Sequence, residues 1–227
     1  MGKIINNSLI IKTITEQNHS VLIAAIIGIV YHTGMKEKLR KVLASRQKIH
    51  ITDSSRTPSA VLIPIFFKEG EYHLLFTQRT EKVKQHKGQI SFPGGACEEE
   101  DKTHFDTALR ECTEEIGMAI GVTELLGELD DFPTSTSNYI IYPFVGVVPW
   151  PYSFKADGRE IKEIIEVPIS ALLNLKGHQE TRVINGKEVT GYFYDYNGKV
   201  IWGATARILH QFLQVWTKAI ATKLDND

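Results

Sequence analysis

One stretch decides the fold and the chemistry of this chain: GQISFPGGACEEEDKTHFDTALRECTEEIGM, Gly88–Met118. Apolar residues recur in its second half at the spacing of a helical turn, which predicts a helix over Asp106–Gly117. The apolar residues that share one side of this helix are Phe105, Leu109, Cys112 and Ile116. We therefore expect this side of the helix to pack inward.

The opposite side of the predicted helix carries three carboxylates, Glu111, Glu114 and Glu115, within an arc of about 100°. Like charges four residues apart destabilise a helix by roughly 0.2–0.5 kcal/mol unless cations neutralise them. A hard divalent cation does this, because Mg²⁺ takes oxygen ligands and is often completed by substrate phosphates. A solvated acidic face on a surface helix is the simpler alternative for such a pattern.

Two neighbouring features favour the cation site over a solvated face. The sequence Phe92-Pro93-Gly94-Gly95 forms a sharp turn at the end of a predicted strand, and Glu98–Asp101 adds four carboxylates before the helix. Arg110 borders the acidic arc and can hold one carboxylate by a bidentate pair, a role that orients ligands.

These residues resemble the Nudix box of the Nudix hydrolases, G-x5-E-x7-R-E-U-x-E-E-x-G-U, where U is aliphatic. The second half of that box fits Arg110–Met118, with Cys112 in the first U position. In the first half, counted from Gly95, Asp101 stands where the box has Glu, and the segment from Asp101 to Arg110 is one residue longer.

A one-residue longer box is similar to that of the coenzyme A pyrophosphatase branch, whose signature is L-L-T-x-R-[SA]-x3-R-x3-G-x3-F-P-G-G. The chain follows it from Leu75 to Gly95, with Phe76 for Leu, Thr80 for Ser or Ala, and Lys84 for Arg. The replacement of Arg by Lys84 matters most, since lysine cannot make a bidentate phosphate contact. The resemblance extends over about residues 35–224.

The resemblance implies an α/β fold, a Nudix-type α/β/α sandwich with a mixed β-sheet. It implies hydrolysis of the diphosphate bond of coenzyme A or a derivative to 3′,5′-ADP and 4′-phosphopantetheine, with Mg²⁺ or Mn²⁺. Glu111 and Glu115 are the implied metal ligands, Glu114 an auxiliary ligand or water-positioning group, and Arg110 their orienter.

A general base beyond the box is expected in the next acidic segment, where Glu160 and Glu163 are the candidates; Glu163 can equally serve a structural role at a strand edge. The cationic contacts for the 3′-phosphate of coenzyme A are expected from a group just before the box. This substrate-binding group consists of Arg79, Lys84, His86 and Lys87, for which a solvated basic loop is the alternative.

Two other functions remain open on the sequence. The first is a Nudix enzyme that acts on ADP-ribose, NADH or another nucleoside diphosphate derivative. The second is a non-catalytic Nudix-like binding module, although such modules tend to lose the box carboxylates that this chain keeps. The expected partner is a small coenzyme A type nucleotide, with no nucleic acid and no membrane span; a homodimer is left open.

In the remaining segments, helices and strands are predicted from the periodicity of apolar residues and from turn residues. A helix over Met35–Arg46 and a hairpin of Ala60–Phe67 with Tyr72–Arg79 are predicted first. A strand over Tyr139–Pro149 follows, and then Glu163–Leu175 as a strand passing into a helix capped by Ser170. Hairpin turns at Asn185-Gly186 and Asn197-Gly198 precede a final helix over Ala204–Leu224.

The composition is that of an ordinary globular protein: 227 residues, 42% hydrophobic and 23% charged, with a formal net charge of -1. Nothing in that charge calls for nucleic acid or an anionic membrane. Two cysteines make no disulfide framework, so a cytoplasmic location is expected. The longest apolar run, Val21–Tyr31, is shorter than a membrane span, and no signal-peptide cleavage site follows it. Residues 1–34 are assigned as an N-terminal extension of a Nudix domain over 35–227.

Overall fold

The computed structural model describes residues 34–82, 86–134, 137–175, 177–184 and 186–222, so the predicted extension lies almost wholly outside the described residues. A helix over 34–44 precedes the first strand. The strands are β1 Thr57–Lys68, β2 Glu71–Arg79, β3 Ile90–Ser91, β4 Gly94–Ala96, β5 Glu124–Glu128, β6 Phe132–Pro133, β7 Tyr139–Val147, β8 Ile161–Pro168, β9 His178–Ile184, β10 Lys187–Tyr196 and β11 Lys199–Ile201. The further helices are α2 His104–Ile116, α3 Ile169–Asn174 and α4 Gly203–Ala221.

The main sheet is mixed, as predicted. Its central order is β3-β2-β1-β7-β5, with β4 on β1, β6 on β7 and β8 on β2. Strands β1 and β7 run parallel, from Thr57 beside Tyr139 to Ile65 beside Val147, whereas the other pairs are antiparallel. The predicted hairpin of β1 and β2 turns at Glu69 and Gly70, both with positive φ (52° and 90°), as a two-residue hairpin turn requires.

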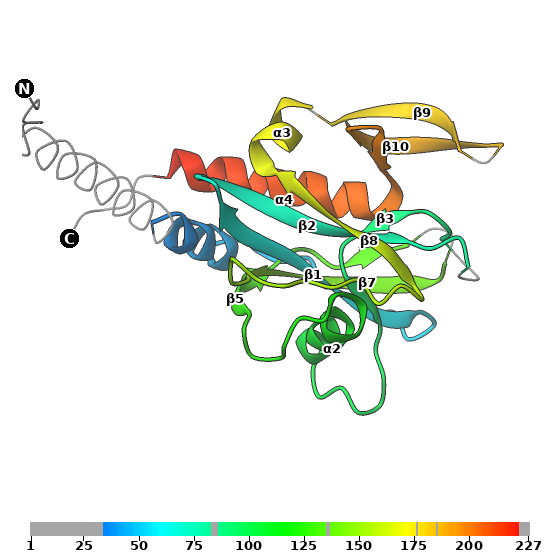
Figure 1. Cartoon of the computed structure of the whole chain (residues 1–227), viewed down its shortest axis with the longest axis horizontal. Helices are drawn as coiled ribbons and strands as arrows, with labels where there is room; N and C mark the ends of the chain where they lie inside the picture. The colour runs from blue at the N-terminus through cyan, green and yellow to red at the C-terminus, as the bar shows by residue number, and fades with distance from the viewer. Residues whose placement is uncertain (1–33, 83–85, 135–136, 176, 185, 223–227) are drawn as a thin grey trace, which may run out of the picture.

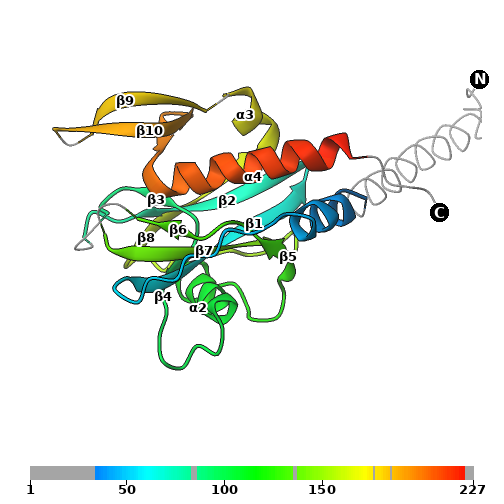
Figure 2. The same cartoon turned by 180° about the vertical axis from the view of Figure 1, so that it is seen from behind.

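Both faces of this sheet are buried, because the apolar residues of β1 alternate between them. Ala60 and Leu62 pack with α2 on one face, and Ile63 and Ile65 pack with α4 and the helix over 34–44 on the other. Figure 1 shows α2 below the sheet and α4 above it. The protein is therefore an α/β/α sandwich, and Figure 2 shows the same layers from behind.

The helix that carries the acidic arc begins at His104 and ends at Ile116, close to its predicted bounds. Thr103 caps it by accepting a hydrogen bond from the Asp106 backbone N–H at 3.1 Å, and Gly117 ends it in the left-handed conformation at φ 66°. Leu109, Cys112 and Ile116 are buried, so the predicted inward face is confirmed.

One local prediction is wrong. The residue that precedes helix α3 is Pro168, and Ser170 lies inside the helix. The Ser170 hydroxyl instead donates to Glu71 Oε2 at 2.6 Å, because β8 pairs with β2 and brings the start of α3 next to the β1–β2 turn. This side chain fastens α3 to the hairpin.

The predicted turn at Asn197-Gly198 closes a hairpin, in which Tyr196 pairs with Lys199. Ile184 likewise pairs with Lys187, although Asn185 of the other predicted turn lies outside the described residues. These pairings connect β9, β10 and β11 into a separate three-stranded sheet. Among the described residues, no helix is long and apolar enough to cross a membrane.

Candidate active site

The turn before α2 brings backbone and carboxylates unusually close together. A Cβ atom on Gly94 would lie 2.2 Å from the Ala60 carbonyl oxygen, and one on Gly95 would lie 2.3 Å from Glu111 Oε1. Only glycine leaves room at these two positions, and Gly94 also has a φ of 152°. The two glycines therefore let the strand end pass directly over the acidic side of α2.

Glu115 is the innermost carboxylate of this side, with 5% of the residue exposed. Its Oε2 accepts a hydrogen bond from the Gly94 backbone N–H at 3.2 Å, and Arg79 Nη1 lies 3.8 Å from its Oε1. Burial, with the charge of Glu111 nearby, raises the pKa of Glu115 to about 8. A buried anion of this kind is costly unless a cation accompanies it.

Glu111 lies one helical turn before Glu115 and is half-buried; its Oε1 accepts from Arg110 Nη1 at 2.9 Å. Burial is the main cause that raises its pKa, and the charges of Glu114 and Glu160 act in the same direction. Glu114 is exposed and receives a weaker contact from Arg110, at 3.4 Å. The three carboxylates thus share a helix side but lie at different depths.

Arg110 is tied to several groups at once. Its Nε and Nη2 each donate to Asp101 at 3.1 Å, and Nη2 also donates to the Ala96 carbonyl at 2.9 Å. Asp101 further accepts from the Thr107 hydroxyl at 2.8 Å, and these hydrogen bonds, that of Arg110 above all, lower its pKa to about 2. Asp101 therefore holds Arg110 in place, and the third guanidinium nitrogen of Arg110, Nη1, donates to Glu111.

Glu160 reaches the acidic side of α2 from the segment before β8. Arg79 Nη2 donates to its Oε2 at 2.9 Å, and the Thr80 backbone N–H donates to its carbonyl at 2.7 Å. Because the same guanidinium lies beside Glu115, Arg79 connects Glu160 to the box. Among the described residues, Arg79 Nε is buried and has no hydrogen-bond partner.

Glu163, the other base candidate, is not brought to this group. It shares its side of β8 with Ile165 and Val167, which pack in the cluster on the α4 face of the sheet. Its Oε1 accepts from Lys199 Nζ at 2.7 Å. The structure thus places Glu163 in a link between the two sheets, on the far side of the main sheet from Glu115.

The predicted substrate-binding residues are only partly together. Arg79 lies among the carboxylates, whereas His86 and Lys87 are exposed in the turn before β3, where His86 Nδ1 lies 2.9 Å from Gln89 Oε1. Lys84 lies outside the described residues.

The side chains present fit a hard divalent cation in chemistry: they offer the carboxylate oxygens of Glu111 and Glu115, with Glu160 approaching from the segment before β8. Among the described residues, no three acidic, histidine or cysteine side chains form a ready-made cage. Arg110 and Arg79 instead form ion pairs with Glu111 and Glu160.

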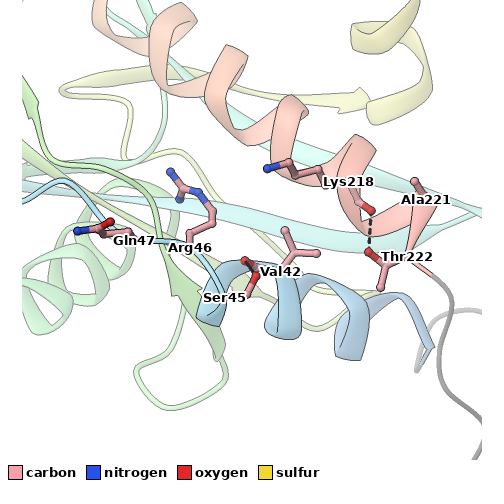
Figure 3. A pocket seen from close by; sticks show the side chains of 7 residues that line it. All are labelled: Val42, Ser45, Arg46, Gln47, Lys218, Ala221 and Thr222. Carbon is pink, nitrogen blue, oxygen red and sulfur yellow. Dashed lines mark hydrogen bonds between the residues drawn. The ribbon is translucent and has the colours of Figure 1, made fainter.

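Two hollows of the described residues lie elsewhere. One, of about 520 Å³, lies between the helix over 34–44 and the end of α4, where Arg46 and Lys218 approach it (Figure 3). The other, of about 350 Å³, lies beside the start of α2 and includes Cys97 and Asp101. Neither contains Glu111 or Glu115, so the candidate site is defined by its carboxylates and not by a cavity.

The chain is similar to known proteins of one family. The family model described as NUDIX domain matches residues 56–187. The uncharacterised Nudix hydrolase NudL of Photorhabdus laumondii is 37% identical over 165 residues, which cover 72% of this chain and 87% of the relative. Its namesake in Yersinia pestis is 33% identical over 166 residues, covering 73% and 82%.

A MutT/nudix family protein from Enterococcus faecalis shares the fold, with a TM-score of 0.51 and 14% identity over 78% of this chain and 66% of that one. The chain therefore belongs to the Nudix family. It is a hydrolase that acts on pyrophosphate bonds, and it is similar in sequence to proteins named NudL. The alternative of a non-catalytic binding module is not favoured.

Proposed function

We propose that the chain is a metal-dependent coenzyme A diphosphatase that yields 3′,5′-ADP and 4′-phosphopantetheine. The observation that supports this most is the position of Arg79. It belongs to the signature that resembles the coenzyme A branch, it lies 3.8 Å from Glu115, and its Nε is buried without a partner among the described residues. A guanidinium beside the box with an N–H that has no partner suits a phosphate oxygen.

The metal is proposed to be Mg²⁺ or Mn²⁺, held by Glu111 and Glu115 with Glu114 in an auxiliary position. When bound, such a cation neutralises the diphosphate and lowers the pKa of bound water. The chain's own residues do the rest. Arg110, fixed by Asp101, holds the Glu111 carboxylate in place, and the Gly94 N–H does the same for Glu115.

Glu160 is the proposed group that takes a proton from the attacking water, since it is exposed and lies next to the box through Arg79. The oxygen of that water bonds to one phosphorus atom, and the bridging P–O bond breaks. Both products leave as phosphate monoesters, with release of a proton. His86, Lys87 and Lys84 are proposed to bind the 3′-phosphate at the turn before β3.

The location is proposed to be the cytoplasm, in keeping with two free cysteines, Cys97 and Cys112.

Product analysis by mass spectrometry tests the activity. Purified protein is incubated with Mg²⁺ or Mn²⁺ and coenzyme A, ADP-ribose, NADH or an oxidised nucleoside triphosphate. We expect 3′,5′-ADP and 4′-phosphopantetheine to form fastest, and chelation of the metal to stop the reaction. Faster hydrolysis of another diphosphate would leave the box chemistry intact and overturn the substrate proposal.

Substrate selection has its own test. Lys87→Ala and His86→Ala are expected to reduce kcat/KM for coenzyme A while leaving the 3′-dephospho form almost unaffected, because only coenzyme A carries that phosphate. Lys82→Ala, which changes an exposed lysine four positions before His86 in the sequence, is the matched control. An unchanged ratio of the two substrates in all variants would remove these residues from the proposal.

A further inference from the structure

The three-stranded sheet ends in an open edge. Strand β10 lies in the middle, with β11 on one side and β9 on the other, and within the described residues no strand pairs with the outer side of β9. Figures 1 and 2 show the β9–β10 hairpin extending away from the sandwich. Val183 on β9 is 68% exposed. An edge of this kind is a template for pairing with another strand.

The register of the hairpin shows which backbone groups are free to pair. Ile184 and Lys187 close the two-residue turn, and such a closing pair is hydrogen-bonded within the hairpin. Antiparallel pairing then alternates, so the N–H and C=O groups of Gln179, Thr181 and Val183 point outward. The 2.7 Å contact between the Thr181 and Thr190 hydroxyls fits this alternation, because side chains are closest in pairs that are not hydrogen-bonded.

The charges on β9 select a partner and a register. Glu180 and Arg182 flank Thr181 on one side of the strand and are ion-paired to each other; Arg182 also donates to Asp195 at 2.7 Å and 3.0 Å. If two copies of β9 pair antiparallel about Thr181, each Glu180 lies opposite the Arg182 of the other copy. Opposite charges in that position stabilise a sheet.

The neighbouring registers are disfavoured by the same charges. A shift of the pairing by one step in either direction keeps the outward backbone groups aligned but places Glu180 opposite Glu180, or Arg182 opposite Arg182. Like charges directly opposite each other destabilise a sheet. The sequence of β9 is therefore complementary to itself in one register only among these three.

From this self-complementarity we infer that β9 is the interface of a two-fold symmetric homodimer, in which the two small sheets join into one six-stranded sheet. Thr181 lies on the two-fold axis, and Gln179 of each copy pairs with Val183 of the other. The contact is isologous, as closed dimers require. It leaves the box, on α2 of each main sheet, outside the interface.

Cross-linking tests the register directly. In a hydrogen-bonded antiparallel pair the two Cα atoms are about 5.5 Å apart, within disulfide range. Under oxidising conditions Thr181→Cys is therefore expected to give a covalent dimer, whereas Gln179→Cys, two residues off the axis, and the unmodified chain are expected to remain uncross-linked. Equal cross-linking of both variants, or none of Thr181→Cys, would overturn the proposed pairing.

Sedimentation velocity over a concentration series tests the dimer itself. Thr181→Pro removes the outward N–H together with the hydroxyl and is expected to weaken dimerisation at least about tenfold. Thr181→Val loses the same hydroxyl but keeps the N–H, and its dimerisation should stay within about threefold of the unmodified chain. A wild-type chain that stays monomeric at about 100 µM, or a Thr181→Pro chain that dimerises normally, would contradict the proposal.

A mixing experiment removes the concern that a variant merely misfolds. Glu180→Arg places arginines at both positions and Arg182→Glu places glutamates at both, so each alone is expected to dimerise at least about tenfold more weakly. Mixed together they are expected to form a heterodimer, because every cross-strand pair is again of opposite charge. A mixture that associates no better than the separate variants would overturn the inference.

Discussion

The two faces of the main sheet bury similar apolar residues but differ in their charged ones. On the α2 face, Glu115 is buried beneath Gly94 and beside Arg79. On the α4 face, Glu163 is bound by Lys199, which links the main sheet to the small one. Glu160 and Glu163 are three residues apart, yet only Glu160 reaches the box. The direction of a side chain from the strand, and not its residue type, decides which carboxylates can take part in chemistry.

The largest expected effect is at the centre of the α2 face. Glu115→Gln removes a charge that we assign to the metal site, and activity should fall by about a thousandfold or more with the fold intact. Glu114→Gln, at the adjacent exposed position, should cost about tenfold or less. Steady-state kinetics with saturating Mg²⁺ measures both. Near-normal turnover of Glu115→Gln would remove it from the site.

The comparison of the two glutamates near β8 comes next. Glu160→Gln is expected to lower kcat by about 10²–10⁴-fold, the usual contribution of a general base. Glu163→Gln is expected to change kcat by less than about threefold, because its carboxylate faces away from the box. Single-turnover rates of both variants test this. The reverse order would show that the α4 face supplies the base.

The smallest effect concerns stability. The hydrogen bonds of Arg110 lower the pKa of Asp101 to about 2 in the folded state. The stabilisation is therefore complete above the unfolded pKa of about 4 and is lost as pH falls toward 2. Asp101→Asn should cost about 1–2 kcal/mol at pH 7, allowing for solvent screening, and progressively less below pH 4. Urea unfolding across this pH range measures it, and a pH-independent difference would contradict the assigned role.

Local patterns predicted the elements that depend on local chemistry. The apolar side of α2, the turn at Asn197-Gly198 and the hairpin of β1 with β2 are each decided within a few residues, and the structure has them. His104 and His210 stack on aromatic rings, those of Tyr142 and Tyr192. The acidic side of α2 was also predictable, because helical periodicity fixes which residues share a side.

Contacts between distant segments could not be predicted in the same way. Ser170 reaches Glu71 across 99 positions, and Lys199 reaches Glu163 across 36. The depth difference between Glu114 and Glu115 depends on the turn at Gly94 that passes over one and not the other. The hydrogen bonds between Arg110 and Asp101 were also not predicted, although Asp101 was noted as standing where the Nudix box has Glu.

Metal binding tests the central claim, that the α2 face alone holds the cation, most directly. Mn²⁺ titration followed by electron paramagnetic resonance needs no substrate and compares Glu115→Gln with Glu163→Gln. We predict that Glu115→Gln binds Mn²⁺ at least about tenfold more weakly, while Glu163→Gln binds it as the unmodified chain does. Equal Mn²⁺ affinity in all three proteins, or a loss only in Glu163→Gln, would contradict the account.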